Sequence, residues 1–442
     1  MDAFESPEEA GDPLEALRKI MRDLGLPDDA DIQDMEVRSD IFRTMMRRLM
    51  PTDGRDPEQI VWETVRQTAR HVVASLGPDP SKNSRVSRQV SDAVHLAELW
   101  LSDATQLPPT SLTPVAWSRA EWIEATLPSW RAMVAPVIAT LAAGVGGATE
   151  SRLTDGPPEL AGLESVIHPI MTRAIAAMFG AHVGEGIGRA ATATMTGTDL
   201  GLPLETGTHV AILPTNLAAI QQQAELGEEA LLLFCALRET ARQRLFGEFG
   251  WIGPQIVALV QHYAREMRID PDGLVGAMES FTPDQLSAES VVAFQTDFTN
   301  LLFSPELTDE QRQILDRLGT LLALVEGWVD DVTVQVARRW MPDWEAVLES
   351  LRRHRVTSQP AQGSIIPMVG LTTSPKAVRD AAAFWEAVRL ARGIEGRDDV
   401  WRHPEAMPEP ADIADPAAFL GRVGADTDPW DDELRRFLDE SA

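Results

Sequence analysis

The stretch from Leu231 to Phe246 constrains this chain more than any other part of it. The stretch reads LLLFCALRETARQRLF. Its first half is apolar on every side, which is typical of a helix that is buried all round. It then places Arg238, Glu239 and Arg242 where a core helix should carry no charge. Because a buried charge is costly unless a partner neutralises it, we expect charged residues from elsewhere in the chain to lie against this helix.

These three residues have the spacing of a His-Glu-x-x-His zinc helix. In that motif two histidine ligands lie one turn apart on one face, and the glutamate after the first is the general base. Here the same frame reads Arg-Glu-Thr-Ala-Arg. Arginine stays protonated up to a pH of about 12 and has no lone pair to offer a metal. The stretch therefore indicates a metallopeptidase-like scaffold that keeps Glu239 and lacks both histidine ligands.

The composition excludes several classes of partner. Of the 442 residues, 44% are hydrophobic and 24% are charged, a profile typical of soluble globular proteins. The 39 basic and 68 acidic residues give a net charge of −29, which repels nucleic-acid phosphates and anionic lipid surfaces. We therefore expect no nucleic acid and no membrane insertion, and the partner, a protein or a peptide, stays unidentified.

Three observations favour the cytoplasm. The one cysteine, Cys235, rules out an intrachain disulfide, and its apolar neighbours predict a buried, inert thiol. The N-terminal MDAFESPEEAGDP is acidic and lacks the basic and apolar regions of a secretory signal. The most apolar run, Met133 to Ala148, is shorter than the roughly 20 residues that span a bilayer. We therefore expect a cytoplasmic protein without a transmembrane segment.

Helical periodicity dominates the chain. Apolar residues recur three and four positions apart, which predicts helices over Pro57–Leu76, Arg85–Ala104 and Pro114–Ala142. Strand patterns are brief, at Thr208–Leu213 and Ser364–Leu371. The sequence thus predicts a mainly α fold, with a large multi-helix core and at most a small β-hairpin.

Capping residues predict three further helix starts. Thr282 and Ser374 each precede a proline, and Thr308 has Gln311 three residues later, as in a capping box. The helix that follows Thr308 is predicted to run from about Asp309 to Arg338.

A glycine stripe lies in another predicted helical segment, Ile167–Thr196. Gly180, Gly184 and Gly188 are spaced four residues apart, so they share one face of the helix. Because charged residues interrupt this segment, we expect the stripe to admit a second soluble helix at close range rather than to pack within a membrane.

The chain divides into three predicted regions. Residues 1–55 form a loosely packed helical region, with helices near Leu14–Leu24 and Ile32–Leu49. Residues 56–395 form the helical core. Residues 396–442 are rich in proline and acidic residues, which predicts an acidic tail with one short helix.

Six stretches together resemble one known family, the zincin-like metallopeptidases of type 2, a bacterial group of zinc-dependent hydrolases. The resemblance covers most of the chain after residue 55. The stretches are AWSRAEWIEATLPSW (116–130), TGTDLGLPL (196–204), LPTNLAA (213–219), RETARQRLF (238–246), LVEGWVDDV (324–332) and RGIEGRDDVWRHPE (392–405).

The resemblance implies a zinc site in the family and assigns positions to it here. Glu239 matches the general base, Arg238 and Arg242 stand where the two histidines would be, and Glu326 stands at a later acidic element. Asp331 stands where the family often has a further histidine. Because this chain departs from the pattern at each of these histidines, we predict no zinc and no other cofactor, and Glu239 is a vestigial general base.

An internal ion-pair cluster is the favoured interpretation of these charges. Glu326 and Asp330 lie four residues apart, hence on one helix face, and match the spacing of Arg238 and Arg242. We predict direct hydrogen bonds between the two pairs, and we place Asp331 in the same cluster. The alternative is a residual catalytic site that uses Glu239 with an unidentified electrophile.

Other candidate residues have structural interpretations. Asp92, His95 and Glu98 share a helical face that is expected to be a solvated surface. His168 and His182 are expected to pack or to cap helices. The tryptophans of the stretch from Ala116 are expected to fill the core, and they are Trp117, Trp122 and Trp130.

These interpretations leave two main functions open, and whether the chain is an enzyme is undecided. The first is a zincin-like protein that is free of zinc and inactive and that serves as a binding or regulatory scaffold. The alternative is an active zinc-dependent metalloprotease or hydrolase that uses Glu239 with non-standard ligands. A purely structural interaction protein is a third class.

Overall fold

The computed structural model describes residues 57–79, 83–155, 164–199, 201–205, 207–224, 227–266, 307–357 and 374–425. All of them belong to one compact unit, Asp56–Ala442. The helices predicted before residue 50 and the capping residue Thr282 lie outside the described residues, and the division of the chain into three regions stays a prediction.

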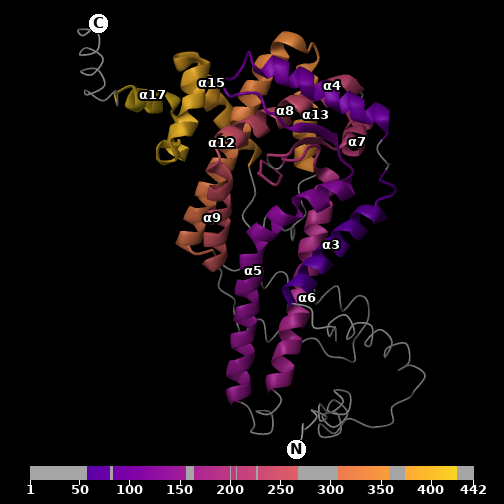
Figure 1. Ribbon diagram of the computed structural model, residues 1–442. Helices are drawn as coiled ribbons and strands as arrows, with labels where there is room; N and C mark the ends of the chain where they lie inside the picture. Colours follow the sequence, from indigo (N-terminus) through magenta and orange to yellow (C-terminus); the bar gives the residue numbers. More distant parts are fainter. Residues whose placement is uncertain are drawn as a thin grey trace, which may run out of the picture. The chain divides into compact units, whose positions relative to one another are not determined.

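The described part of the chain is mainly helical, as predicted (Figure 1). The α-helices are α3 (Pro57–Ser75), α4 (Ser84–Leu101), α5 (Arg119–Asp155), α6 (Glu164–Ala193), α7 (Pro214–Ala224), α8 (Glu228–Glu248), α9 (Ile252–Arg265), α12 (Asp309–Trp340), α13 (Trp344–Thr357), α15 (Pro375–Asp398), α16 (Pro410–Ala414) and α17 (Pro416–Ala425). Two short 3₁₀ helices, η2 (Asp399–Arg402) and η3 (Pro404–Ala406), follow α15.

The described residues contain one two-stranded sheet, and it is parallel. Strand β1 (Thr113–Ala116) pairs with β2 (His209–Ile212), with Thr113 opposite His209. The sheet is as small as the sequence predicted, but it is not a hairpin, because a hairpin joins neighbouring antiparallel strands, whereas α5 and α6 separate these two. The second predicted strand, Ser364–Leu371, lies outside the described residues.

The start of the helix predicted at Pro114 is also wrong. Residues from Thr113 to Ala116 form β1, and α5 begins only at Arg119. The side chain of Glu121 marks this start, since its Oε2 accepts hydrogen bonds from the backbone N–H of Ser118 at 2.8 Å and from the Ser118 hydroxyl at 2.9 Å. The apolar pattern continues from strand to helix, so periodicity alone gave no boundary.

Two predicted helix starts are confirmed by their caps. Thr308 Oγ1 accepts from Gln311 N at 3.1 Å, and Gln311 Oε1 accepts from Thr308 N at 2.9 Å, which completes a capping box for α12. Ser374 Oγ accepts from Lys376 N at 3.3 Å at the start of α15.

The glycine stripe of α6 lies against α3, as predicted. A Cβ atom at Gly184 would stand 2.5 Å from the carbonyl oxygen of Val65, and one at Gly188 would stand 2.8 Å from that of Ala69. Only glycine allows the two helix backbones to approach this closely.

Helices α8 and α12 form the centre of the packed core. Every residue from Phe234 to Phe246 in α8 and from Leu321 to Thr333 in α12 is buried. Helix α8 packs against α4, α12 and β2, and α12 also packs against α9 and α15. The predicted core tryptophans Trp117, Trp122 and Trp130 are buried, as is Cys235.

Packing continues beyond residue 395, into the segment predicted as a tail. Trp401 in η2 is fully buried and stacks on Trp385 of α15, with ring centroids 5.3 Å apart. Phe419 in α17 is buried against Phe384. Helices η2 and α17 therefore contribute buried side chains to the packed core.

No helix among the described residues is long and apolar enough to cross a lipid bilayer.

Candidate functional site

Two arginines of α8 meet two carboxylates of α12 in the buried core. Arg238 and Arg242 lie one helical turn apart, and so do Glu326 and Asp330, so that the two pairs face each other. All four side chains are at least nine-tenths buried. We call these four residues the α8–α12 cluster.

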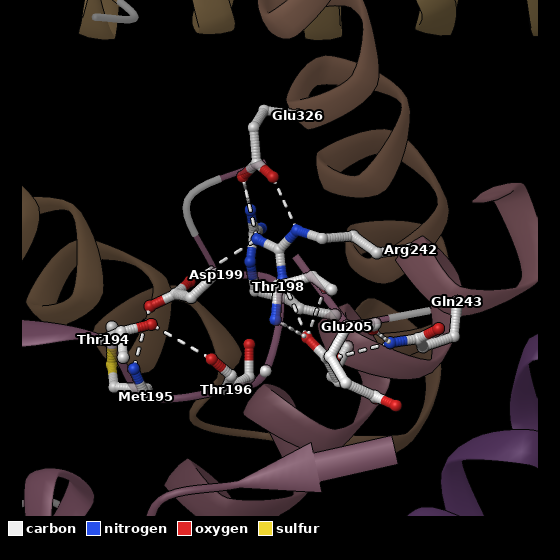
Figure 2. Close-up of polar contacts among 12 residues, drawn as sticks. Thr194, Met195, Thr196, Thr198, Asp199, Glu205, Arg242, Gln243 and Glu326 are labelled. Carbon is white, nitrogen blue, oxygen red and sulfur yellow. Dashed lines mark hydrogen bonds and ion pairs between the residues drawn. The ribbon is translucent and has the colours of Figure 1, made fainter. Parts of the chain in front are cut away.

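Arg242 binds both oxygens of one carboxylate. Its Nε donates to Glu326 Oε1 at 2.6 Å, and its Nη2 donates to Glu326 Oε2 at 2.9 Å. Figure 2 shows Arg242 between Glu326 and Asp199, and the Arg242 Nη2 to Asp199 Oδ1 distance is 3.5 Å. This two-pronged geometry is the strongest form of arginine–carboxylate pairing.

Arg238 bridges the two carboxylates of α12. Its Nη2 donates to Glu326 Oε2 at 2.9 Å, and its Nη1 donates to Asp330 Oδ1. Asp330 Oδ2 also accepts from Arg352 of α13 at 3.3 Å, at the edge of the cluster. Each carboxylate of the cluster therefore accepts hydrogen bonds from two arginine side chains.

Glu239 is fully buried beside the cluster and faces a different element. Its Oε2 accepts from the Thr198 hydroxyl at 2.8 Å and from Thr198 N at 3.2 Å, and its Oε1 accepts from Gln243 Nε2 at 3.1 Å. Burial raises the pKa of Glu239 above its usual value, although the charge of Arg242, 3.8 Å away, opposes the shift.

Gly197, Thr198, Asp199 and Gly201 line this site, and the sequence interpretation did not place them there. Gly201 adopts a positive φ of 70°, and a Cβ on it would lie 3.3 Å from Glu326 Oε1. A Cβ on Gly197 would lie 3.1 Å from Glu239 Oε1. The Asp199 side chain is held in place because its Oδ2 accepts a hydrogen bond from Met195 N at 3.1 Å. The two glycines flanking Thr-Asp-Leu were the signal in the sequence, because they let a backbone approach the carboxylates.

Asp331 does not join the α8–α12 cluster, so that part of the predicted cluster is wrong. Successive helical residues point about 100° apart, and Asp331 faces away from α8. Its Oδ2 accepts from Arg389 Nε at 3.0 Å and from Arg397 Nη1 at 2.8 Å, and its Oδ1 accepts from Arg389 Nη2 at 3.0 Å. Its partners therefore come from α15.

A second buried network extends from Asp331 through Arg397. Arg397 Nε donates to Asp398 Oδ1 at 2.9 Å, and Trp328 Nε1 donates to the same oxygen at 2.9 Å. Thr105 Oγ1 donates to Asp398 Oδ2 at 2.6 Å. This network joins α12 to the end of α15 and to the residues after α4, and none of its members other than Asp331 was predicted.

Arg244 is a further buried charge of α8 that the sequence interpretation overlooked. Its Nε donates to Glu98 Oε2 at 2.8 Å, and its Nη2 donates to the Glu98 carbonyl at 2.6 Å. Glu98 is thus an internal partner rather than part of a solvated stripe. Asp92 and His95 are exposed, as predicted. The side chain of His168 lies outside the described residues.

The residues present at the α8–α12 cluster do not fit a zinc ion. Arginine has no lone pair for a metal, and the guanidinium groups of Arg238 and Arg242 already occupy both oxygens of Glu326. The oxygens of Glu239 are likewise held by Thr198 and Gln243. A dipositive ion here would also lie against two fixed positive charges, which repel it.

Comparisons with known proteins point to one family. A family model for zincin-like metallopeptidases matches residues 60–420. A solved structure from Chloroflexus aurantiacus, provisionally described as a hydrolase with a novel fold, is similar with a TM-score of 0.54 and 22% identity; the match covers 82% of this chain and 98% of that one. No curated protein matches the chain.

Proposed function

Because the chain belongs to the zincin-like metallopeptidase family, we propose that it keeps the family scaffold and has exchanged the zinc site for the α8–α12 cluster. On this proposal it is an inactive relative that holds no zinc at the α8–α12 cluster and serves as a binding or regulatory scaffold for a protein or peptide. The buried single cysteine is in keeping with the cytoplasm as its proposed compartment.

One observation carries the proposal: Arg242 and Arg238 bind both carboxylate oxygens of Glu326, which would otherwise be available to a metal ion. Three guanidinium nitrogens lie 2.6–2.9 Å from its two oxygens. In a zincin the cation offsets the repulsion between a ligand glutamate and the general base in a poorly hydrated site. Here Arg242 supplies positive charge between Glu326 and Glu239, and Arg238 supplies it between Glu326 and Asp330. The old active site thus becomes an internal link between α8 and α12.

The alternative, a zinc-dependent hydrolase that acts through Glu239, rests on the raised pKa of that residue. A raised pKa is a common property of a general base. However, Glu239 is fully buried, and each of its oxygens accepts a hydrogen bond from Thr198 or Gln243. The carboxylate of Glu239 is therefore not exposed to solvent in this arrangement, which favours the scaffold.

The test is metal content together with peptidase activity. The untagged full chain would be purified without chelators, its zinc measured, and its activity assayed on an unstructured protein substrate. The proposal predicts no zinc that depends on Glu239 or Glu326 and no activity above that of the Glu239→Gln variant. Hydrolysis that the wild type performs and the Glu239→Gln variant does not would overturn it.

A further inference from the structure

Three potential metal ligands converge where the end of α9 meets the start of α12, apart from the α8–α12 cluster. They are His262, Glu266 and Glu310, and their ligand atoms all lie within 4.8 Å of one another. His262 Nε2 lies 3.4 Å from Glu310 Oε1. Two ligands on a tetrahedral zinc ion, each at about 2.0–2.2 Å, are roughly 3–4 Å apart, so this separation already suits a shared ion.

The backbone that carries these ligands is fixed by buried contacts. Gln311 donates from Nε2 to the Glu266 carbonyl at 3.2 Å, and the same side chain closes the capping box with Thr308. Gln311 is 2% exposed. The end of α9 and the first turn of α12 are therefore tied together next to the three ligands, so that an ion would not have to order them.

The ligand atoms themselves are reachable from solvent. The side chains of His262 and Glu310 are 47% and 57% exposed. With neutral imidazole the site carries two negative charges, and the net charge of the whole chain is −29, which raises the local concentration of cations. A site with one nitrogen and two carboxylate ligands leaves at least one position for water, as open zinc sites do.

We infer that His262, Glu266 and Glu310 bind a divalent first-row transition metal ion, with zinc as the best match. Imidazole selects such ions over calcium and magnesium, which prefer oxygen ligands. The bound ion links the end of α9, at Arg265, to the start of α12, at Asp309. It stabilises the folded chain, because it binds the folded state and finds no assembled site in the unfolded one.

Zinc titration of the untagged full chain by calorimetry, with zinc chloride as the probe, tests the inference. We expect one saturable site, and we expect His262→Ala and Glu310→Gln each to weaken its affinity by about tenfold or more. The matched control is His95→Ala, which removes an exposed histidine on α4 and should leave binding unchanged. Zinc should also raise the melting temperature of the wild type and of His95→Ala more than that of His262→Ala.

The outcomes separate this inference from the proposed function. Absence of saturable zinc binding to the wild type, or full affinity in His262→Ala, overturns the inference. If the affinity that remains in His262→Ala is lost on adding Glu239→Gln or Glu326→Gln, the proposed function is overturned as well. Circular dichroism of each variant shows whether it is folded, and a folded His262→Ala chain with unchanged binding is decisive against the site.

Discussion

Arg242 of α8 holds both carboxylate oxygens of Glu326 of α12, with Nε 2.6 Å from Oε1 and Nη2 2.9 Å from Oε2. Both side chains are at least nine-tenths buried. The two charges are therefore interdependent: each is tolerated in the core because the other is there.

Removing one member of this pair should destabilise the protein strongly. We expect Arg242→Ala to lower the free energy of unfolding by about 3–5 kcal/mol, because it leaves the Glu326 carboxylate buried with one partner fewer. Urea denaturation measures the change. The matched control is Arg312→Ala, which breaks a solvent-exposed pair with Asp309 and should change stability by less than about 1 kcal/mol. Equal effects of the two variants would show that the pair is not an important buried contact.

The close approach of α3 and α6 should not tolerate a side chain at Gly184. A Cβ there would stand 2.5 Å from the Val65 carbonyl oxygen, so Gly184→Ala should cost about 1–3 kcal/mol through forced separation of the helices. Gly319→Ala is the control, since nothing lies within 4 Å of its Cβ position on α12. That variant should be neutral or slightly stabilising, and a Gly184→Ala variant that behaves in the same way would contradict the packing described here.

Glu239 should make stability depend on pH. Because burial raises its pKa in the folded protein above the ordinary value of 4.5, the folded state holds a proton that the unfolded chain releases as the pH rises past 4.5. Stability from this residue is therefore full below that pH and declines until the pH passes the raised pKa. Glu239→Gln, which keeps the shape and carries no charge, should gain in melting temperature relative to the wild type as the pH rises. Parallel curves for the two proteins would contradict the raised pKa.

Histidines in place of the two arginines should recreate a weak zinc site. With Arg238→His and Arg242→His, imidazoles replace guanidiniums one turn apart on the face of α8 that meets Glu326. The change is best made in a His262→Ala chain, so that zinc at the end of α9 does not contribute. We expect saturable zinc binding that His262→Ala alone does not show. A folded variant without zinc binding would mean that Glu326 is no longer placed as a ligand.

The sequence predicted those features that depend on local spacing. The spacing of Arg238 and Arg242 and of Glu326 and Asp330 indicated facing helix surfaces, and the capping box at Thr308 predicted the start of α12. Asp331 shows the limit of this reasoning. It is adjacent to Asp330 in sequence, yet one residue along a helix turns the side chain by about 100°, and its partners come from α15.

Features that depend on contacts distant in sequence were not predictable from the pattern. Strand β1 has four residues and includes Pro114, and it is a strand because β2 pairs with it. Asp199 and Thr198 reach the site because a segment with two glycines passes beside α8, which no periodicity indicates. Arg244 has the same charge as Arg238 and Arg242 but finds its partner, Glu98, on α4.

We propose that guanidinium groups, and not a metal, neutralise the carboxylates between α8 and α12. X-ray diffraction at the zinc absorption edge, from crystals of the wild-type chain grown with zinc chloride, tests it most directly, because anomalous scattering locates each zinc ion. We expect no anomalous peak between Glu239 and Glu326 and clear density for Arg242 against Glu326. A peak within coordinating distance of both glutamates, with the arginine side chains displaced from Glu326, would contradict it.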